Sequence, residues 1–116
     1  MNRFQAVVRF AIHLGKNEAF KRIAEDMIRL TREKDTGTVR LDIFVNDDGS
    51  EAVFYEEFVS PEARVEHLEN MGENVAAMLA ISDMRADVWT HADPALRASV
   101  EGYDVTFYTP LLRLTE

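Results

Sequence analysis

The stretch VFYEEFVSPEARVEHLEN, residues 53–70, places a strand directly before a helix. Residues 53–59 are rich in the β-branched and aromatic side chains that strands favour. Ser60 is a good N-cap residue, and Pro61 suits the first helical position, where its missing N–H is harmless. We therefore expect a strand that ends near Val59 and a helix that begins at Pro61.

The segment before this junction predicts two further strands and one long helix. Residues 4–14 alternate with period two, which indicates a strand. Apolar residues at helical spacing predict a helix that is capped by Asn17 and ends near Gly37. A strand at residues 39–45 is followed by Asn-Asp-Asp-Gly at 46–49, a turn sequence that predicts a hairpin with the strand at 52–59.

The segment after the junction predicts the rest of the fold. The helix from Pro61 is expected to bury Val65 and Leu68 and to break or kink at Gly72. Residues 84–91 alternate again and predict a fourth strand. Beyond it, the sequence predicts a short helix from Asp93 and Pro94 to about residue 102, and a short edge strand at 103–107.

The expected order is βαββαβ followed by a small αβ unit, which is the α+β ferredoxin-like arrangement of an antiparallel sheet with two helices on one face. We expect a single domain over residues 1–116, with a core at about 4–91 and a C-terminal extension at 92–116. The second face of the sheet, which carries Trp89 and other apolar residues, has no element left to cover it. An exposed apolar face of this size favours association, so we expect a homodimer.

Composition excludes several classes of protein. The net charge is −8, with 21 acidic and 13 basic residues, which disfavours nucleic-acid binding. Cysteine is absent, so disulfides and thiolate metal sites are excluded. The longest apolar run, residues 75–81, is too short to span a bilayer, and residues 1–15 do not form a signal-peptide core. We expect a cytoplasmic protein that does not bind membranes.

Three segments carry a resemblance to a known family: AFKRIAEDMIRLTRE (19–33), VRLDIFVNDDG (39–49) and YEEFVSPEARVEHL (55–68). In motif, order and spacing they resemble the antibiotic biosynthesis monooxygenase family, over about residues 4–91. The resemblance implies a dimeric α/β barrel in which two such sheets pack face to face and a pocket lies between each sheet and its helices. It also implies the oxidation of a small phenolic or hydroquinone substrate by O2, with no cofactor.

Candidate site residues follow from this resemblance and from side-chain chemistry. His67 is the expected catalytic base, because histidine accepts a proton near neutral pH, and Arg9 is expected to stabilise the substrate anion. The predicted substrate-binding residues come from the strands: Tyr55, Trp89, Arg85 and His13. Structural alternatives remain for His67, which could bond a backbone carbonyl, and for Trp89, which could pack in the core.

Glu56 and Glu57 are neighbours on a strand and must point to opposite sides of the sheet. One of them therefore faces an apolar layer, where a carboxylate needs a partner such as Arg9, Arg40 or Arg85. The sequence leaves open which glutamate this is, and whether the charge lines a pocket or forms a structural ion pair.

Two other functions compete with oxygenation. A non-catalytic dimeric barrel that binds a small aromatic or lipid-like ligand would use the same pocket. Haem degradation, found in a related branch, fits less well, because Ala77 stands where that branch has its haem-ligating histidine. The three histidines, His13, His67 and His91, lack the spacing of metal-ligand pairs, so no metal site is expected.

Overall fold

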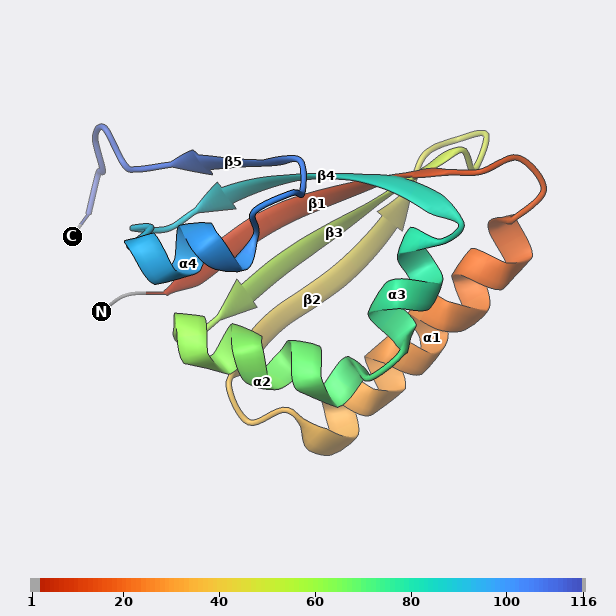
Figure 1. Cartoon of the computed structure of the whole chain (residues 1–116), viewed down its shortest axis with the longest axis horizontal. Coiled ribbons are helices and arrows are strands. Elements are labelled where there is room, and N and C mark those ends of the chain that lie inside the picture. Colours follow the sequence, from red (N-terminus) through yellow and green to blue (C-terminus); the bar gives the residue numbers. More distant parts are fainter. Residues whose placement is uncertain (1–2, 116) are drawn as a thin grey trace.

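The computed structural model describes residues 3–115 and forms one five-stranded sheet with four helices (Figure 1). In chain order the elements are β1 (Phe4–Ile12), α1 (Asn17–Lys34), β2 (Thr38–Val45), β3 (Glu51–Phe58), α2 (Pro61–Met71), α3 (Asn74–Leu79), β4 (Ser82–Trp89), α4 (Pro94–Ser99) and β5 (Val105–Tyr108). The strand order is β2-β3-β1-β4-β5, and all neighbours are antiparallel except β4 and β5. The predicted ferredoxin-like α+β fold is confirmed.

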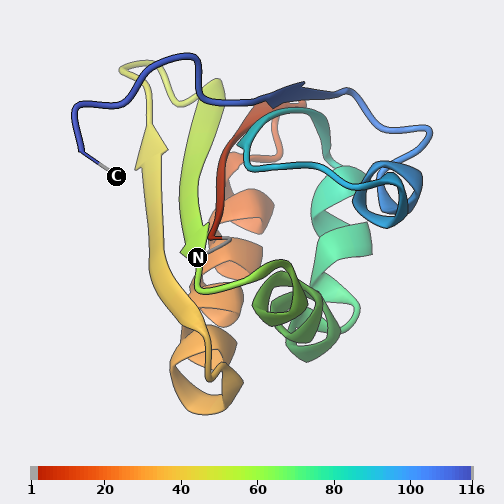
Figure 2. The same ribbon diagram turned by 90° about the vertical axis from the view of Figure 1, so that its left-hand side faces the viewer.

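The helices all lie on one side of the sheet, as Figures 1 and 2 show. The sheet curves around them, so that its concave face and the helices enclose the core (Figure 2). None of the helices among residues 3–115 is long and apolar enough to cross a membrane.

The core follows the period-two pattern of the sequence. In β1, the central strand, Phe4, Ala6, Val8 and Phe10 all point towards the helices and are buried. Aromatic side chains pack on this face: the ring of Phe10 lies with its centroid 4.8 Å from that of Phe54 in β3 and 5.6 Å from that of Phe20 in α1. Burial of a side chain of this size contributes about 1.5–3 kcal/mol, so this layer fixes the register of the sheet.

The starts of α2 and α4 are set by the caps that the sequence indicates, whereas α4 ends at Ser99, earlier than the expected end near residue 102, and the start of α1 also differs. The Ser60 hydroxyl accepts a hydrogen bond from the N–H of Ala63 at 3.1 Å, and Asp93 accepts one from Leu96 at 2.8 Å. The prediction that Asn17 caps α1 is wrong. The helix begins at Asn17 itself, whose side-chain amide donates to the carbonyl oxygen of Gly49 and so ties the helix start to the β2–β3 turn.

Helix α2 presents a different face to the core from the one expected. Val65 is 51% exposed and Leu68 36%, whereas His67 and Met71, one turn apart, are buried. The prediction that Val65 and Leu68 form the buried stripe is therefore wrong. The polar side chain of His67 can occupy the core because it has a buried hydrogen-bond partner there.

The C-terminal extension adds to the same sheet rather than forming a separate unit. After α4, strand β5 pairs with β4 in parallel, with Val105 opposite Ala86 and Phe107 opposite Val88. This places α4 beside α2 on the concave side of the sheet (Figure 2).

Candidate functional site

A cavity of about 240 Å³ lies between the sheet and the helices; we refer to it as the inner cavity. It is lined mainly by apolar side chains, and its charged or ionisable lining residues are Glu56, Arg64, His67 and Tyr103. An apolar cavity of about 150 Å³ is enough to bind benzene. The inner cavity can therefore hold an aromatic molecule somewhat larger than one ring.

His67 lies in the wall of this cavity, and its imidazole ring is paired with Asp35. The Nδ1 atom of His67 is 2.6 Å from Oδ2 of Asp35, and both side chains are only 2% exposed. The ring of Phe58 covers the imidazole, with centroids 5.1 Å apart. The histidine is thus held in one orientation by a buried carboxylate and an aromatic neighbour.

Asp35 follows α1 and is held by three donors. Besides His67, the hydroxyl of Thr38 donates to Oδ2 at 2.6 Å and the amide of Asn70 donates to Oδ1 at 2.8 Å. Burial by itself raises the pKa of Asp35, but the hydrogen bonds from Thr38, Asn70 and His67 outweigh it and leave the pKa below its usual value. Asp35 is therefore an ionised carboxylate at neutral pH.

The charge of Asp35 fixes the tautomer of His67. An ionised carboxylate only accepts hydrogen bonds, so the Nδ1 atom of His67 must carry the proton. In the neutral ring the lone pair then lies on Nε2. Among residues 3–115 this Nε2 atom has no hydrogen-bond partner, although His67 lines the inner cavity. It is placed to accept a proton from a molecule bound there.

Glu56 and Arg64 supply the other two charged groups of the cavity. Burial raises the pKa of the Glu56 carboxyl, and the electrostatic effects of the nearby His67 and Arg64 side chains offset only part of that increase. The guanidinium carbon of Arg64 lies 5.1 Å from the centre of the Phe4 ring. Burial lowers the pKa of Arg64, which the charge of Glu56 partly counters. In the described part of the chain neither side chain makes an ion pair or a hydrogen bond.

The strand residues predicted to form the site lie on the opposite side of the sheet from His67. We refer to this side as the open face; its side chains include Val7, Arg9, Phe44, Tyr55, Arg85, Asp87 and Trp89. Arg9 forms an ion pair with Asp87 at 2.8 Å, and the rings of Tyr55 and Trp89 are 6.4 Å apart. Within one chain, the sheet separates all of these residues from the inner cavity.

His13 is also distant from the other predicted residues. Its Nε2 atom lies 3.2 Å from the carboxylate of Asp83, just beyond the end of β1 where β4 begins. Trp89 lies opposite Gln5, near the other end of β1. Eight residues of strand span about 26 Å, so one small molecule cannot contact both His13 and Trp89. Of the six predicted site residues, the structure places only His67 in the inner cavity.

Three residues of this site, Glu56, Asp35 and Arg64, were not among the predicted site residues. In β3, Glu56 lies two residues from both Phe54 and Phe58, so its side chain must be on the same side of the strand as theirs. This alternation could have placed Glu56 on the side of the helices. Glu57 points to the open face, where it pairs with Arg3, and the charges near Glu56 come from α2 rather than from strand arginines. Nothing in the sequence around Asp35 indicated that its side chain would reach the site. Arg64 could have been found, because it lies one helical turn before His67.

The ferredoxin-like sheet, with all helices on one face and a cavity between sheet and helices, defines the structural class as a small α+β protein. A model of the family described as antibiotic biosynthesis monooxygenase matches residues 3–78, which is most of the chain. The chain belongs to this family. No curated protein matches the sequence significantly.

Solved structures show the same fold at low sequence identity. MupZ from Pseudomonas fluorescens is 18% identical, with a TM-score of 0.84 over 100% of this chain and 96% of that one. SnoaB, a cofactor-independent oxygenase from Streptomyces nogalater, is 18% identical, with a TM-score of 0.67 over 80% and 96% of the two chains. Rv0793 from Mycobacterium tuberculosis is 24% identical, with a TM-score of 0.68 over 80% and 98%.

Proposed function

We propose that the protein is a monooxygenase that oxidises a small phenolic or hydroquinone substrate with O2, without a metal or organic cofactor. The observation that carries this proposal is that His67 lines an apolar cavity while its Nδ1 atom is bonded to Asp35, which leaves Nε2 as the proton acceptor. Membership of the antibiotic biosynthesis monooxygenase family and the likeness to SnoaB, a cofactor-independent oxygenase, support the reaction type.

In this reaction the substrate's hydroxyl group loses its proton to His67. The resulting phenolate gives one electron to O2, and the ring radical and superoxide then combine at a ring carbon to form a peroxide anion. This anion takes the proton back from His67 and becomes a hydroperoxide. Loss of water from the hydroperoxide leaves a quinone, so that one oxygen atom of O2 enters the product and the other enters water. The apolar cavity would hold the two radicals together and keep bulk water away.

Arg64 takes the role of anion stabiliser that the sequence analysis gave to Arg9. Arg64 lies in the cavity wall, makes no ion pair with any carboxylate among residues 3–115, and is on the same helix as His67. A positive charge close to the phenolic oxygen lowers the pKa of that hydroxyl group and so assists its ionisation. Glu56 does not oppose this effect in its protonated form, which its raised pKa favours.

Glu56 also supports a second candidate function. A carboxyl group with a raised pKa and a histidine with a free Nε2 atom form an acid and a base in one cavity. Such a pair could move a proton from one position of a substrate to another without O2. A third candidate, a barrel that only binds an aromatic or lipid-like ligand, needs the cavity but not the acid or the base.

We also propose that two chains pair through their open faces. Phe44 is 55% exposed and Trp89 39%, and both lie on this face beside Tyr55. In such a dimer Arg9, Arg85, Tyr55 and Trp89 would lie at the interface between the two sheets. This arrangement gives the open-face residues a role in assembly rather than in substrate binding.

Oxidation of a panel of phenols and hydroquinones under air tests the proposed reaction. In the variant His67→Asn, the new amide can still donate to Asp35, but the ring nitrogen that accepts the proton is lost. We expect its rate to fall by about 10²–10⁴-fold at neutral pH, and by less at high pH, where the substrate ionises unaided. His13→Asn, far from the cavity, is the matched control and should match the parent.

The dependence of turnover on O2 distinguishes the candidate functions from one another. The proposed oxygenase should consume one O2 for each quinone formed and should stop under nitrogen. Turnover that continues without O2 and is lost in Glu56→Gln would favour the acid–base candidate. If no substrate is oxidised, or if His67→Asn is as active as the parent, the proposed reaction is wrong.

A further inference from the structure

The C-terminal extension forms part of the wall of the inner cavity. Four lining residues, Ser99, Val100, Tyr103 and Val105, come from α4, β5 and the segment between them. The family match ends at residue 78, and SnoaB and Rv0793 each align with only 80% of this chain. The cavity is therefore completed by a segment outside the family match.

This part of the wall is attached firmly to the sheet. Strand β5 pairs with β4, Leu96 and Val100 are buried, and Asp93 caps α4. Arg97 further links α4 to β5, with its guanidinium carbon 4.8 Å from the centre of the Phe107 ring. The extension thus gives the cavity a fixed boundary, whose position depends on the size of its side chains.

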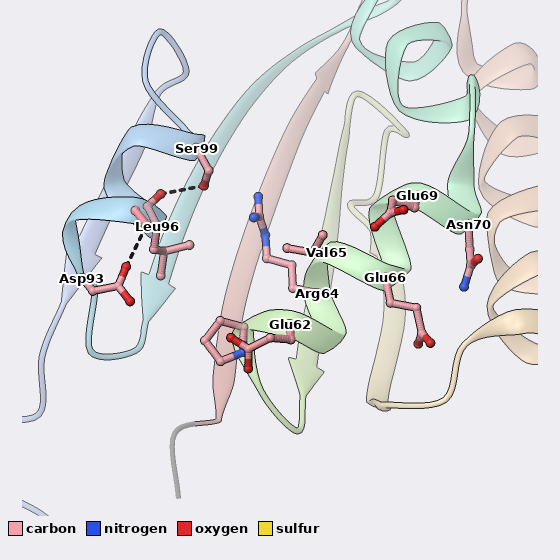
Figure 3. Close-up of a pocket in the computed structure, with 11 residues that line it drawn as sticks. Glu62, Arg64, Val65, Glu66, Glu69, Asn70, Asp93, Leu96 and Ser99 are labelled. Carbon is pink, nitrogen blue, oxygen red and sulfur yellow. Dashed lines mark hydrogen bonds between the residues drawn. The ribbon is translucent and has the colours of Figure 1, made fainter.

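A second hollow of about 410 Å³ lies on the outside of the protein between α2 and α4; we refer to it as the outer groove (Figure 3). Arg64 and Ser99 line both the outer groove and the inner cavity. In Figure 3 the Arg64 side chain extends from α2 towards the end of α4, where Ser99 lies, while Glu66 and Asn70 point away from it. The two hollows therefore meet between Arg64 and Ser99.

We infer that the C-terminal extension selects the substrate, which enters through the outer groove between Arg64 and Ser99 and is an aromatic molecule carrying a single oxyanion. The aromatic part matches the apolar wall of the inner cavity, and the oxyanion matches the guanidinium of Arg64 at its entrance, which makes no ion pair within residues 3–115. Four carboxylate residues also line the outer groove and would repel a second negative charge: Glu62, Glu66, Glu69 and Asp93.

This inference rests on the proposed function in taking the inner cavity as the substrate site. Its test measures binding rather than turnover, so the two can fail separately. The probes are naphthalene-2-carboxylate and naphthalene-2-carboxamide, which have the same shape and differ in charge. Affinity is measured by calorimetry and the association rate by stopped-flow fluorescence.

The entrance is tested with two substitutions at the end of α4. Ser99→Trp places a large ring where the two hollows meet and should slow association by at least about tenfold. Ala98→Trp adds the same ring at an exposed neighbour that lines neither hollow, and it should bind the probes as the parent does.

The wall of the inner cavity at Val100 and the charge of Arg64 are tested with separate substitutions. Val100→Trp should weaken binding of both probes at least about tenfold, which corresponds to about 1.4 kcal/mol. Val100→Ala should improve binding of the longer anthracene-2-carboxylate relative to the naphthalene probe, and it keeps the wall testable if Val100→Trp does not fold. Arg64→Met should weaken binding of the carboxylate about tenfold more than that of the carboxamide.

Three results would overturn the inference. One is that the parent binds neither probe. Another is that Ser99→Trp associates as fast as Ala98→Trp, which would place the entrance elsewhere. The third is that Val100→Ala leaves the size preference unchanged, which would show that the extension does not select the ligand.

Discussion

The imidazole of His67 and the carboxylate of Asp35 lie 2.6 Å apart in the interior and join α2 to the segment that follows α1. Two segments far apart in sequence thus meet through one charged hydrogen bond. Because Asp35 also accepts from Thr38 and Asn70, it links α2 to the start of β2 as well. The pair therefore has a structural role in addition to its proposed part in proton transfer.

Asp35→Asn should destabilise the fold by about 1–3 kcal/mol at neutral pH, because buried donors lose their charged acceptor. The pKa of Asp35 is lower in the folded state than the ordinary value of 3.8, so its stabilisation is present above about that pH and is lost as the pH falls through the folded value. The difference between variant and parent should therefore shrink in acid. Urea denaturation at pH 7 and pH 3 measures it, with the exposed Asp47→Asn as the control.

Glu56→Gln should stabilise the fold at alkaline pH. The pKa of Glu56 is raised above 4.5 in the folded state, so ionisation costs stability as the pH rises from that value through the higher folded pKa. Glu57 is the matched control, because its pKa shifts in the opposite direction: the hydrogen bond from Arg3 lowers it. Glu57→Gln should therefore reduce the stability of the fold above pH 4.5. Melting temperatures between pH 4 and pH 8 compare the two variants. Parallel curves for Glu56→Gln and the parent would contradict the expectation.

Gly37→Ala should destabilise the protein by about 1–3 kcal/mol through a steric clash. A Cβ atom at residue 37 would lie 2.5 Å from the Cβ atom of Ala63 and 3.0 Å from a methyl carbon of Val59. Ala63→Gly alone should cost about 1 kcal/mol, as glycine does inside a helix. In the double variant the clash is removed, so the two losses should be less than additive in a chemical denaturation cycle. Strict additivity would show that α2 does not approach residue 37 this closely.

Trp89→Lys should convert the expected homodimer into a monomer, because it places a charge on the apolar part of the open face. Light scattering at micromolar concentration should give twice the chain mass for the parent and the chain mass for this variant. Leu14→Lys is the control, since Leu14 is fully exposed in a loop and should leave the dimer intact. A parent protein with the mass of a single chain would refute the prediction.

Much of the fold could be predicted because it depends on local signals. The period-two pattern located all five strands, and Ser60, Asp93 and Gly72 marked helix ends as expected. The rotation of α2 could not be predicted, because it is set by the buried partner of His67. That partner, Asp35, is 32 residues away, and its approach requires the close packing of Gly37 against Ala63.

The site was predicted less completely for a related reason. The alternation of residues along the strands showed that Arg9, Arg85 and Trp89 share one face, and the chemistry of these side chains led us to expect them at the substrate site. In the structure the helices cover the other face, so the pocket charges come from α2 and from Glu56. The alternation of residues along a strand identifies which side chains lie on the same face of the sheet. Which face the helices cover depends on tertiary packing.

The parallel pairing of β5 with β4 also protects the protein from edge-to-edge aggregation. Without β5, the eight residues of β4 would form an edge of the sheet, with unpaired N–H and C=O groups open to a strand of another molecule. Strand β5 replaces this edge with one of four residues, and Pro110, two residues beyond it, has no N–H to donate. The extension therefore leaves a shorter template for intermolecular strand addition on this side of the sheet.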